Sequence, residues 1–98
     1  MIKTLVTGAL GRMGRETLKA VHNSKTLELC AAVDINPTTQ TLGQIIGAEL
    51  ALPMHTELSK ALEAAKPRVV VDFTRPDVVM TNLRLVLSKG IFAVVGTT

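Results

Sequence analysis

Short, almost wholly apolar runs recur along the chain and alternate with longer stretches of mixed character. The runs cover residues 2–7, 27–33, 69–73 and 91–95 and are rich in valine, isoleucine and leucine. Runs of this length and composition are typical of strands buried on both faces, as in a parallel sheet. Four buried strands are therefore predicted.

Helical spacing of apolar residues marks three of the intervening stretches, at 12–22, 57–65 and 77–89. Apolar side chains repeat every three or four positions there, and charged residues occupy the remaining face. Thr56 is a suitable N-cap for the second helix. Gly90 is a suitable C-cap for the third. Each stretch is predicted to be a helix that packs on the sheet.

The segment 36–54 is less regular than the rest of the chain. A short helix is predicted at 42–46 and a brief strand at 52–54. Strands that alternate with helices predict an α/β fold, a Rossmann-type doubly wound parallel sheet with right-handed crossovers.

Length and composition narrow the class of protein. A chain of 98 residues forms at most one domain, and its 47% hydrophobic content suits a globular core. No apolar run approaches the roughly 20 residues that span a bilayer. Residues 1–3 lead directly into a predicted strand without a signal-peptide pattern. Cys30, the single cysteine, lies in an apolar run and is predicted to be a buried small residue. A cytoplasmic protein is expected.

Charge and aromatic content argue against nucleic acid as a partner. The net charge is +3, the basic residues are scattered, and Phe73 and Phe92 are the only aromatic residues. Nucleic-acid binders concentrate basic residues and usually add aromatic residues for stacking. The two histidines, His22 and His55, have no second ligand at metal-binding spacing, so no metal site is expected.

The sequence TGALGRMGRE places Gly8, Gly11 and Gly14 between the first predicted strand and the first predicted helix. In this context a glycine-rich turn brings bare backbone and the positive helix N-terminus to a pyrophosphate. The spacing departs from the usual G-x-G-x-x-G, because Leu10 takes the place of the middle glycine. A tight turn without a ligand is the alternative. A Walker phosphate loop is not supported, since Gly14 is followed by Arg15.

Asp34 follows the second predicted strand, twenty residues after Gly14. A carboxylate there binds the adenosine ribose in dinucleotide folds. The alternative is an aspartate that starts a turn toward Pro37. Asp34 would repel a 2′-phosphate and Ile35 brings no cation, which favours NADH over NADPH; Arg12 is a cation that could offset this preference.

Two further segments end buried strands. In VVVDFTRPDV, Asp72 lies at the carboxyl end of its strand, where ligands of open α/β sheets bind. The terminal VVGTT brings Gly96 to Thr98 after the last strand. Both loops are expected at the same crevice as the glycine turn. The alternative for residues 72–76 is a simple strand-to-helix turn.

Together, VTGALGRMGRE, AAVD, VVVDFTRPDV and VVGTT resemble the amino-terminal half of the dihydrodipicolinate reductases, also called 4-hydroxy-tetrahydrodipicolinate reductases. The resemblance is collinear and covers nearly the whole chain. It implies hydride transfer from NADH or NADPH to a cyclic unsaturated dicarboxylate, giving tetrahydrodipicolinate in lysine and diaminopimelate biosynthesis.

The same resemblance assigns cofactor contacts position by position. Residues 8–14 would hold the pyrophosphate, with Arg12 near the adenosine, and Asp34 would bind the ribose. Residues 73–75 would line the nicotinamide pocket, and residues 96–98 would contact the nicotinamide amide. The implied cofactor-binding set is Gly8, Ala9, Leu10, Gly11, Arg12, Met13, Gly14, Asp34, Phe73, Thr74, Arg75, Gly96, Thr97 and Thr98.

In that family a second domain binds the substrate, supplies the proton and forms the tetramer, and this sequence does not contain it. The resemblance therefore implies an isolated dinucleotide-binding domain, residues 1–98, truncated after about the fifth strand. We expect it to bind cofactor weakly and not to turn over, and to self-associate through the bare edge of the strand at 91–95. The rival interpretation is a stand-alone regulatory module that senses NAD or another nucleotide without catalysis.

Overall fold

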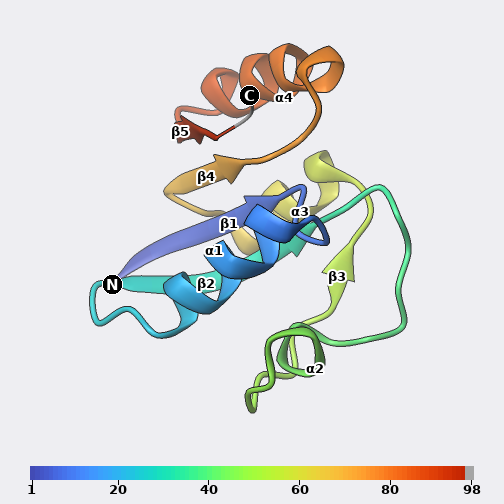
Figure 1. The fold of residues 1–98 in the computed structure, drawn as a ribbon. Coiled ribbons are helices and arrows are strands. Elements are labelled where there is room, and N and C mark those ends of the chain that lie inside the picture. The colour runs from blue at the N-terminus through green and yellow to red at the C-terminus, as the bar shows by residue number, and fades with distance from the viewer. Residues whose placement is uncertain (97–98) are drawn as a thin grey trace.

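Five parallel strands form the central sheet of the computed structural model, which describes residues 1–96 (Figure 1). The strands are β1 Ile2–Thr7, β2 Leu27–Val33, β3 Met54–His55, β4 Val69–Asp72 and β5 Phe92–Val95. Their order in the sheet is β3-β2-β1-β4-β5. This confirms the predicted α/β fold, because the order reverses beside β1, as in a doubly wound sheet.

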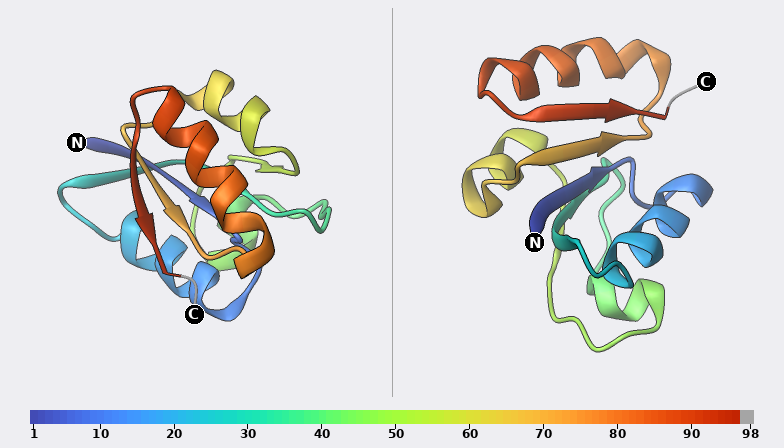
Figure 2. Two further views of the ribbon diagram at one scale, coloured as in Figure 1. Left: turned by 90° about the horizontal axis from the view of Figure 1, so that it is seen from above. Right: turned by 90° about the vertical axis from the view of Figure 1, so that its left-hand side faces the viewer.

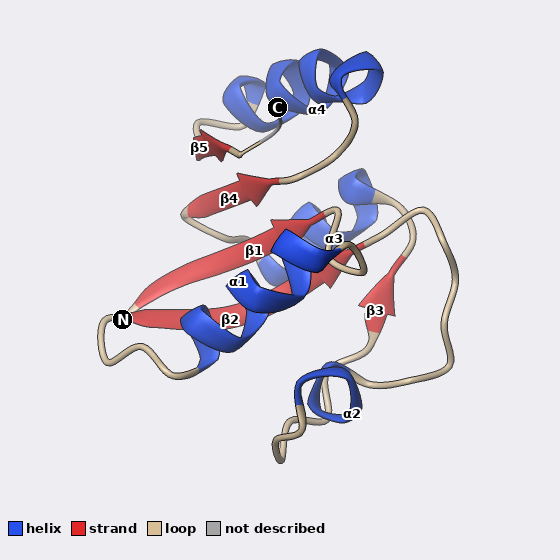
Figure 3. Cartoon of the chain, in the orientation of Figure 1, coloured by secondary structure: helices blue, strands red, loops and turns tan. Residues whose placement is uncertain are grey.

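Four helices connect the strands (Figure 3). They are α1 Arg12–His22, α2 Leu42–Ile46, α3 Leu58–Ala65 and α4 Pro76–Ser88. Pro76 takes the first helical position of α4, where the missing proline N–H costs nothing. The C-cap of α4 is Lys89 rather than Gly90 as predicted, and Gly90 follows it with a φ of +72°.

Two further details of the predicted secondary structure are wrong. The brief strand expected at 52–54 lies one to two residues later, at Met54–His55, where it pairs with β2. The N-cap of α3 is Glu57 rather than Thr56, and no side chain caps that helix end. The strand is displaced because its position is set by pairing with β2 rather than by the local apolar run.

Helices cover both faces of the sheet (Figure 2). Side chains of the central strands are divided between two cores, one on each face. Leu5 and Val33 pack with α3 and α4 residues on one face. Val6 and Ala32 pack with α1 and α2 residues on the other. Because successive side chains of a strand point to opposite faces, an unbroken apolar run fills both cores.

The short helix α2 anchors the irregular segment before β3. Thr41 and Gln44 form a capping box, in which each side chain accepts a hydrogen bond from the other residue's backbone N–H. Gly47 ends the helix with a φ of +73°. Leu42 is fully buried in the core that α1 also covers. Local capping and one buried leucine therefore hold this segment to the sheet.

The end of the sheet formed by β5 is less covered than its centre. β5 pairs only with β4 among the described strands, and Phe92 and Val94 remain 66% and 55% exposed. Helix α4 contacts β5 (Figure 2), yet Val86 is its only buried residue. β5, whose outer edge was predicted to be bare, is thus an end strand of the sheet formed by the described residues.

Cys30 is partly buried rather than fully buried as predicted. It packs against the core beneath α3, and its thiol lies 3.3 Å from the carbonyl oxygen of Thr4. Burial raises the pKa of the Cys30 thiol, although the positive charge of Lys3 opposes this shift. Among the described residues, none of the helices is long and apolar enough to span a membrane.

Candidate functional site

The first glycine of the predicted motif makes the turn after β1. Gly8 has a φ of +76°, a conformation that residues with a Cβ rarely adopt. A Cβ on Gly8 would lie 2.7 Å from the carbonyl carbon of Phe73. The backbone N–H groups of Gly8 and Ala9 donate to the carbonyl oxygen of Val33. Glycine therefore lets the turn after β1 lie directly against the turn after β4.

The other two glycines serve the start of α1. A Cβ on Gly14 would lie 2.2 Å from the carbonyl oxygen of Gly8, so the first turn of α1 rests on the backbone of the glycine turn. The close contact that Gly14 permits is therefore with the glycine turn rather than with strand β1. Gly11 is the N-cap of α1. The atom nearest to a Cβ added on Gly11 would be the Gly8 carbonyl oxygen, 3.6 Å away, which is an ordinary contact distance.

Asp34 is buried at the carboxyl end of β2 and joins two segments. Its Oδ2 accepts a hydrogen bond from the Leu10 N–H at 2.8 Å. Its Oδ1 accepts from the backbone N–H of Asn36 at 2.9 Å and from the Asn36 side-chain amide at 3.2 Å. The turn that was the alternative interpretation is therefore present. The same carboxylate also fixes the glycine turn, so the two interpretations are compatible.

Asp72 occupies the corresponding position at the carboxyl end of β4 and is 3% exposed. Its Oδ1 accepts hydrogen bonds from the backbone N–H and the hydroxyl of Thr74. Its Oδ2 accepts from the side-chain amide of Asn82, 3.1 Å away on α4. These bonds satisfy a buried carboxylate that has no cation within ion-pair distance among the described residues.

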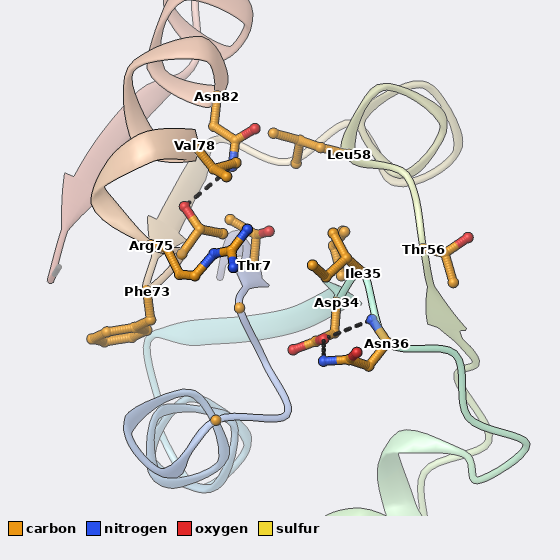
Figure 4. Close-up of a pocket in the computed structure, with 14 residues that line it drawn as sticks. Thr7, Asp34, Ile35, Asn36, Thr56, Leu58, Phe73, Arg75, Val78 and Asn82 are labelled. Atoms are coloured by element: carbon orange, nitrogen blue, oxygen red, sulfur yellow. Dashed lines mark hydrogen bonds between the residues drawn. The ribbon is translucent and has the colours of Figure 1, made fainter.

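A cavity of about 400 Å³ opens at the carboxyl ends of β1, β2 and β4 (Figure 4). Its lining comes from strand ends and from the turns and helices that follow them: Thr7, Gly8, Gly11, Val33, Asp34, Ile35, Asn36, Thr56, Leu58, Phe73, Thr74, Arg75, Val78 and Asn82. Asp34 and Asn36 form one side, and Phe73 and Arg75 form the other (Figure 4). Ligands of open α/β sheets bind in this position.

The cavity brings together six of the residues singled out from the sequence, namely Gly8, Gly11, Asp34, Phe73, Thr74 and Arg75. The others stand outside its lining. Ala9 is buried in the core and Gly14 lies beneath the glycine turn. Arg12 and Met13 are exposed on α1. Thr97 and Thr98 lie outside the described residues.

Gly96 contributes through a contact with Phe73 rather than through the cavity wall. A Cβ on Gly96 would lie 2.2 Å from the Cε1 atom of the Phe73 ring. The Gly96 N–H donates to the carbonyl oxygen of Asp72. Arg75, mostly exposed, lies 3.5 Å from the Asp77 carboxylate. The residue that follows β5 therefore lies directly against the Phe73 ring beside the cavity.

Sequence inspection missed Thr56, Leu58, Val78 and Asn82. Nothing in the type of these residues marks them as cavity residues, and only their positions could have done so. Thr56 and Leu58 follow β3, and Val78 and Asn82 lie four residues apart on the first two turns of α4. Within the part of the chain that the structure describes, no three or more His, Cys, Asp or Glu side chains form a metal-binding group.

Comparison with known proteins decides the family. A family model described as "Dihydrodipicolinate reductase, N-terminus" matches residues 2–98. The chain belongs to this family. It is similar to the 4-hydroxy-tetrahydrodipicolinate reductases of Syntrophomonas wolfei and Listeria welshimeri, at 45% and 43% identity. The alignments cover 98% and 99% of this chain but 36% and 37% of the relatives. The chain therefore spans little more than a third of their length.

A solved structure agrees with this assignment. The dipicolinate-bound dihydrodipicolinate reductase from Paenisporosarcina sp. TG-14 superposes with a TM-score of 0.82 at 30% identity. The superposition covers 100% of this chain and 38% of that one. The resemblance drawn from the glycine turn and the three later strand ends is confirmed at the level of family and fold.

Proposed function

We propose that this chain is the NAD(P)H-binding part of a reductase that converts 4-hydroxy-tetrahydrodipicolinate to tetrahydrodipicolinate by hydride transfer, in lysine and diaminopimelate biosynthesis. The observation that carries the proposal is the meeting of the glycine turn and buried Asp34 at one cavity, joined by the bond from the Leu10 N–H. Family membership supplies the reaction and the substrate class.

The pyrophosphate would lie over residues 8–14. A Cβ on Gly11 would make only an ordinary contact, 3.6 Å from the Gly8 carbonyl oxygen, and without that Cβ an anion can approach the backbone closely. The first N–H groups of α1 have no acceptor within the helix, and the helix dipole makes this end attractive to anions. No acidic residue occupies the first turn of α1, and exposed Arg12 adds a positive charge toward the adenosine side.

The adenosine ribose would bind Asp34. Each carboxylate oxygen accepts about two hydrogen bonds. Oδ1 already accepts two from Asn36, whereas Oδ2 accepts one, from Leu10. One acceptor position on Oδ2 therefore suits a ribose hydroxyl. A 2′-phosphate would meet the same negative charge, and neighbouring Ile35 offers no cation, so we favour NADH over NADPH.

The nicotinamide would lie on the side of Phe73, Thr74 and Arg75. The ring of Phe73 is held against Gly96, and the bonds to Asp72 fix the backbone of Thr74. In this proposal residues 96–98 contact the nicotinamide amide and Thr98 lies nearest the substrate. When bound, the reduced nicotinamide supplies the hydride. The residues of this chain bind and orient it.

Substrate binding and protonation are proposed to need residues beyond this chain. No His, Cys or Lys side chain lines the cavity in the described part of the chain, and the relatives are nearly three times as long. The 98 residues are therefore proposed to form one dinucleotide-binding domain that binds cofactor without turnover. The family assignment favours this role over a nucleotide-sensing regulatory module, since the relatives named above carry the reductase name.

Self-association through β5 is a second part of the proposal. β5 is the end strand of the sheet and carries exposed Phe92, Val94 and Val95. An apolar edge strand with free backbone hydrogen-bonding groups pairs readily with another chain. We expect dimers or larger species of the 98-residue chain at high concentration.

Titration with NADH and NADPH, followed by cofactor fluorescence, tests the cofactor assignment. Asp34→Asn keeps the shape of the side chain but removes its charge, and Asp34→Ala removes both. We expect each to weaken NADH binding by about tenfold, the loss of one charge-assisted hydrogen bond. We expect Asp34→Asn to weaken NADPH binding less, because the repulsion of the 2′-phosphate also disappears.

Glu63→Gln is the matched control, since Glu63 is an exposed carboxylate on α3, outside the cavity. It should leave both affinities unchanged. Unchanged NADH affinity in both Asp34 variants would contradict the ribose assignment. Failure of the unmodified protein to bind either cofactor would contradict the proposed function itself.

A further inference from the structure

Buried Asp72 is the point at which the side chain of Asn82 meets the turn after β4. Asp72 is 3% exposed, and both oxygens of its carboxylate accept hydrogen bonds. Thr74 binds Oδ1, while Asn82 binds Oδ2 from the neighbouring helix. The Asn82 amide also lies 3.4 Å from the Thr74 hydroxyl. A buried carboxylate that loses one such donor carries a large desolvation penalty.

Few side chains are fully buried near the start of α4, where Val78 and Val79 are half-buried. Val86, on its last turns, is its only buried residue, whereas Met80 and Leu87 are 54% and 60% exposed. Asn82 lies six residues after Pro76, on the second turn of the helix. Val86 therefore holds the far end of α4 to the core, while at the end that borders the cavity the contact of Asn82 with Asp72 adds to the half-buried valines.

The same contact lies beside one wall of the cavity, to which Asn82 itself belongs. Residues 73–75 connect Asp72 to α4, and the backbone of Phe73 lies so close to Gly8 that no Cβ fits between them. Thr74, Arg75, Val78 and Asn82 all line the cavity on this side. A shift at the start of α4 therefore moves the wall that faces the glycine turn (Figure 4).

We propose that Asn82 is a positioning residue for dinucleotide binding, which acts through Asp72 to hold the turn 73–75 and the start of α4 against the glycine turn. The ligand in this inference rests on the proposed function. The orientation of the Asn82 amide follows from its partner, because an ionised carboxylate only accepts hydrogen bonds and so requires the NH₂ group. The position thus needs a donor, rather than merely a side chain of this size.

Two substitutions with side chains close in size to asparagine test whether position 82 needs a hydrogen-bond donor or only a side chain of that volume. Asn82→Leu has no donor at any pH. Asn82→Asp donates only while one proton is shared with Asp72, since two carboxyl groups this close do not both ionise readily. We expect Asn82→Leu to weaken NAD⁺ binding about tenfold at every pH. We expect Asn82→Asp to bind almost normally near about pH 5.5 and about tenfold more weakly near about pH 8.

Calorimetric titration with NAD⁺, which is stable in this pH range, measures these affinities. The other charged groups near this wall are Asp34 at the end of β2 and Arg75, which pairs with Asp77. They are present in all three proteins, so the unmodified protein corrects for their effect. An Asn82→Asp affinity that follows the unmodified protein at both pH values would overturn the inference, as would an Asn82→Leu affinity within twofold of it.

Hydrogen exchange of the Thr74 amide gives a readout that needs no cofactor. This N–H donates to Asp72 at 2.7 Å, and we expect its exchange to accelerate about tenfold in Asn82→Leu, and in Asn82→Asp only at the higher pH. If the unmodified protein fails to bind NAD⁺, the proposed function is wrong and the exchange result alone decides the role of Asn82. If Asn82→Leu fails to fold, the pH dependence of Asn82→Asp decides it.

Discussion

Replacement of Gly14 by alanine tests whether the start of α1 rests on the glycine turn. The new Cβ would lie 2.2 Å from the Gly8 carbonyl oxygen and 2.8 Å from the Ala9 Cα, whereas ordinary contacts begin at 3.4 Å. Both neighbours are backbone atoms, so α1 or the turn must move by about 1 Å. Overpacking typically costs about 1–3 kcal/mol, and this contact belongs at the upper end of that range.

Alanine also favours the helix over glycine by about 1 kcal/mol, which offsets part of the cost. We therefore expect Gly14→Ala to lower the free energy of unfolding by about 2 kcal/mol. Urea unfolding followed by circular dichroism measures it. With an m-value of about 2 kcal/mol/M, the midpoint should fall by about 1 M.

Gly11→Ser is the matched control, because a Cβ on Gly11 has only an ordinary contact at 3.6 Å and serine is a good N-cap. Its free energy of unfolding should stay within about 0.5 kcal/mol of the unmodified protein, while its NADH affinity falls because the added side chain obstructs the approach of the pyrophosphate. Equal urea midpoints for Gly14→Ala and the unmodified protein would refute the packing argument, and so would equal losses for Gly14→Ala and Gly11→Ser.

Three further outcomes are expected. Gly96→Ala should displace the Phe73 ring, because the new Cβ would lie 2.2 Å from its Cε1 atom, and should weaken NADH binding in a fluorescence titration. Unchanged affinity would show that the position of this ring does not affect cofactor binding. Burial raises the pKa of the Cys30 thiol, so near about pH 8 a disulfide reagent should react more slowly with the folded protein than with the chain unfolded in urea; equal rates would contradict that burial. Val94→Lys should reduce self-association in sedimentation velocity, since a charged edge strand pairs poorly; a monodisperse monomer before substitution would exclude edge pairing.

The predictable part of the fold is the part encoded locally. Residues 2–7 and 27–33 form inner strands of the sheet, which helices cover on both faces. Their side chains are therefore apolar almost without interruption, and this pattern predicts buried strands. The position of β3 was displaced because two residues of pairing with β2 carry almost no local signal. The N-cap of α3 was also predicted wrongly. Thr56 has a suitable side chain, but the helix begins one residue later than that cap requires, and Glu57 takes the N-cap position.

Local patterns along the chain are enough to predict the alternation of elements, the glycine turn after β1 and the acidic residues at the ends of β2 and β4. Each of these depends on neighbours within a few positions, or on motifs whose spacing reflects one turn. The tertiary structure decided what these groups contact. Asp34 reaches Leu10, Asn82 reaches Asp72, and Gly14 rests on Gly8. Those contacts depend on which strands are neighbours and how closely the helices approach, and three-dimensional packing sets both.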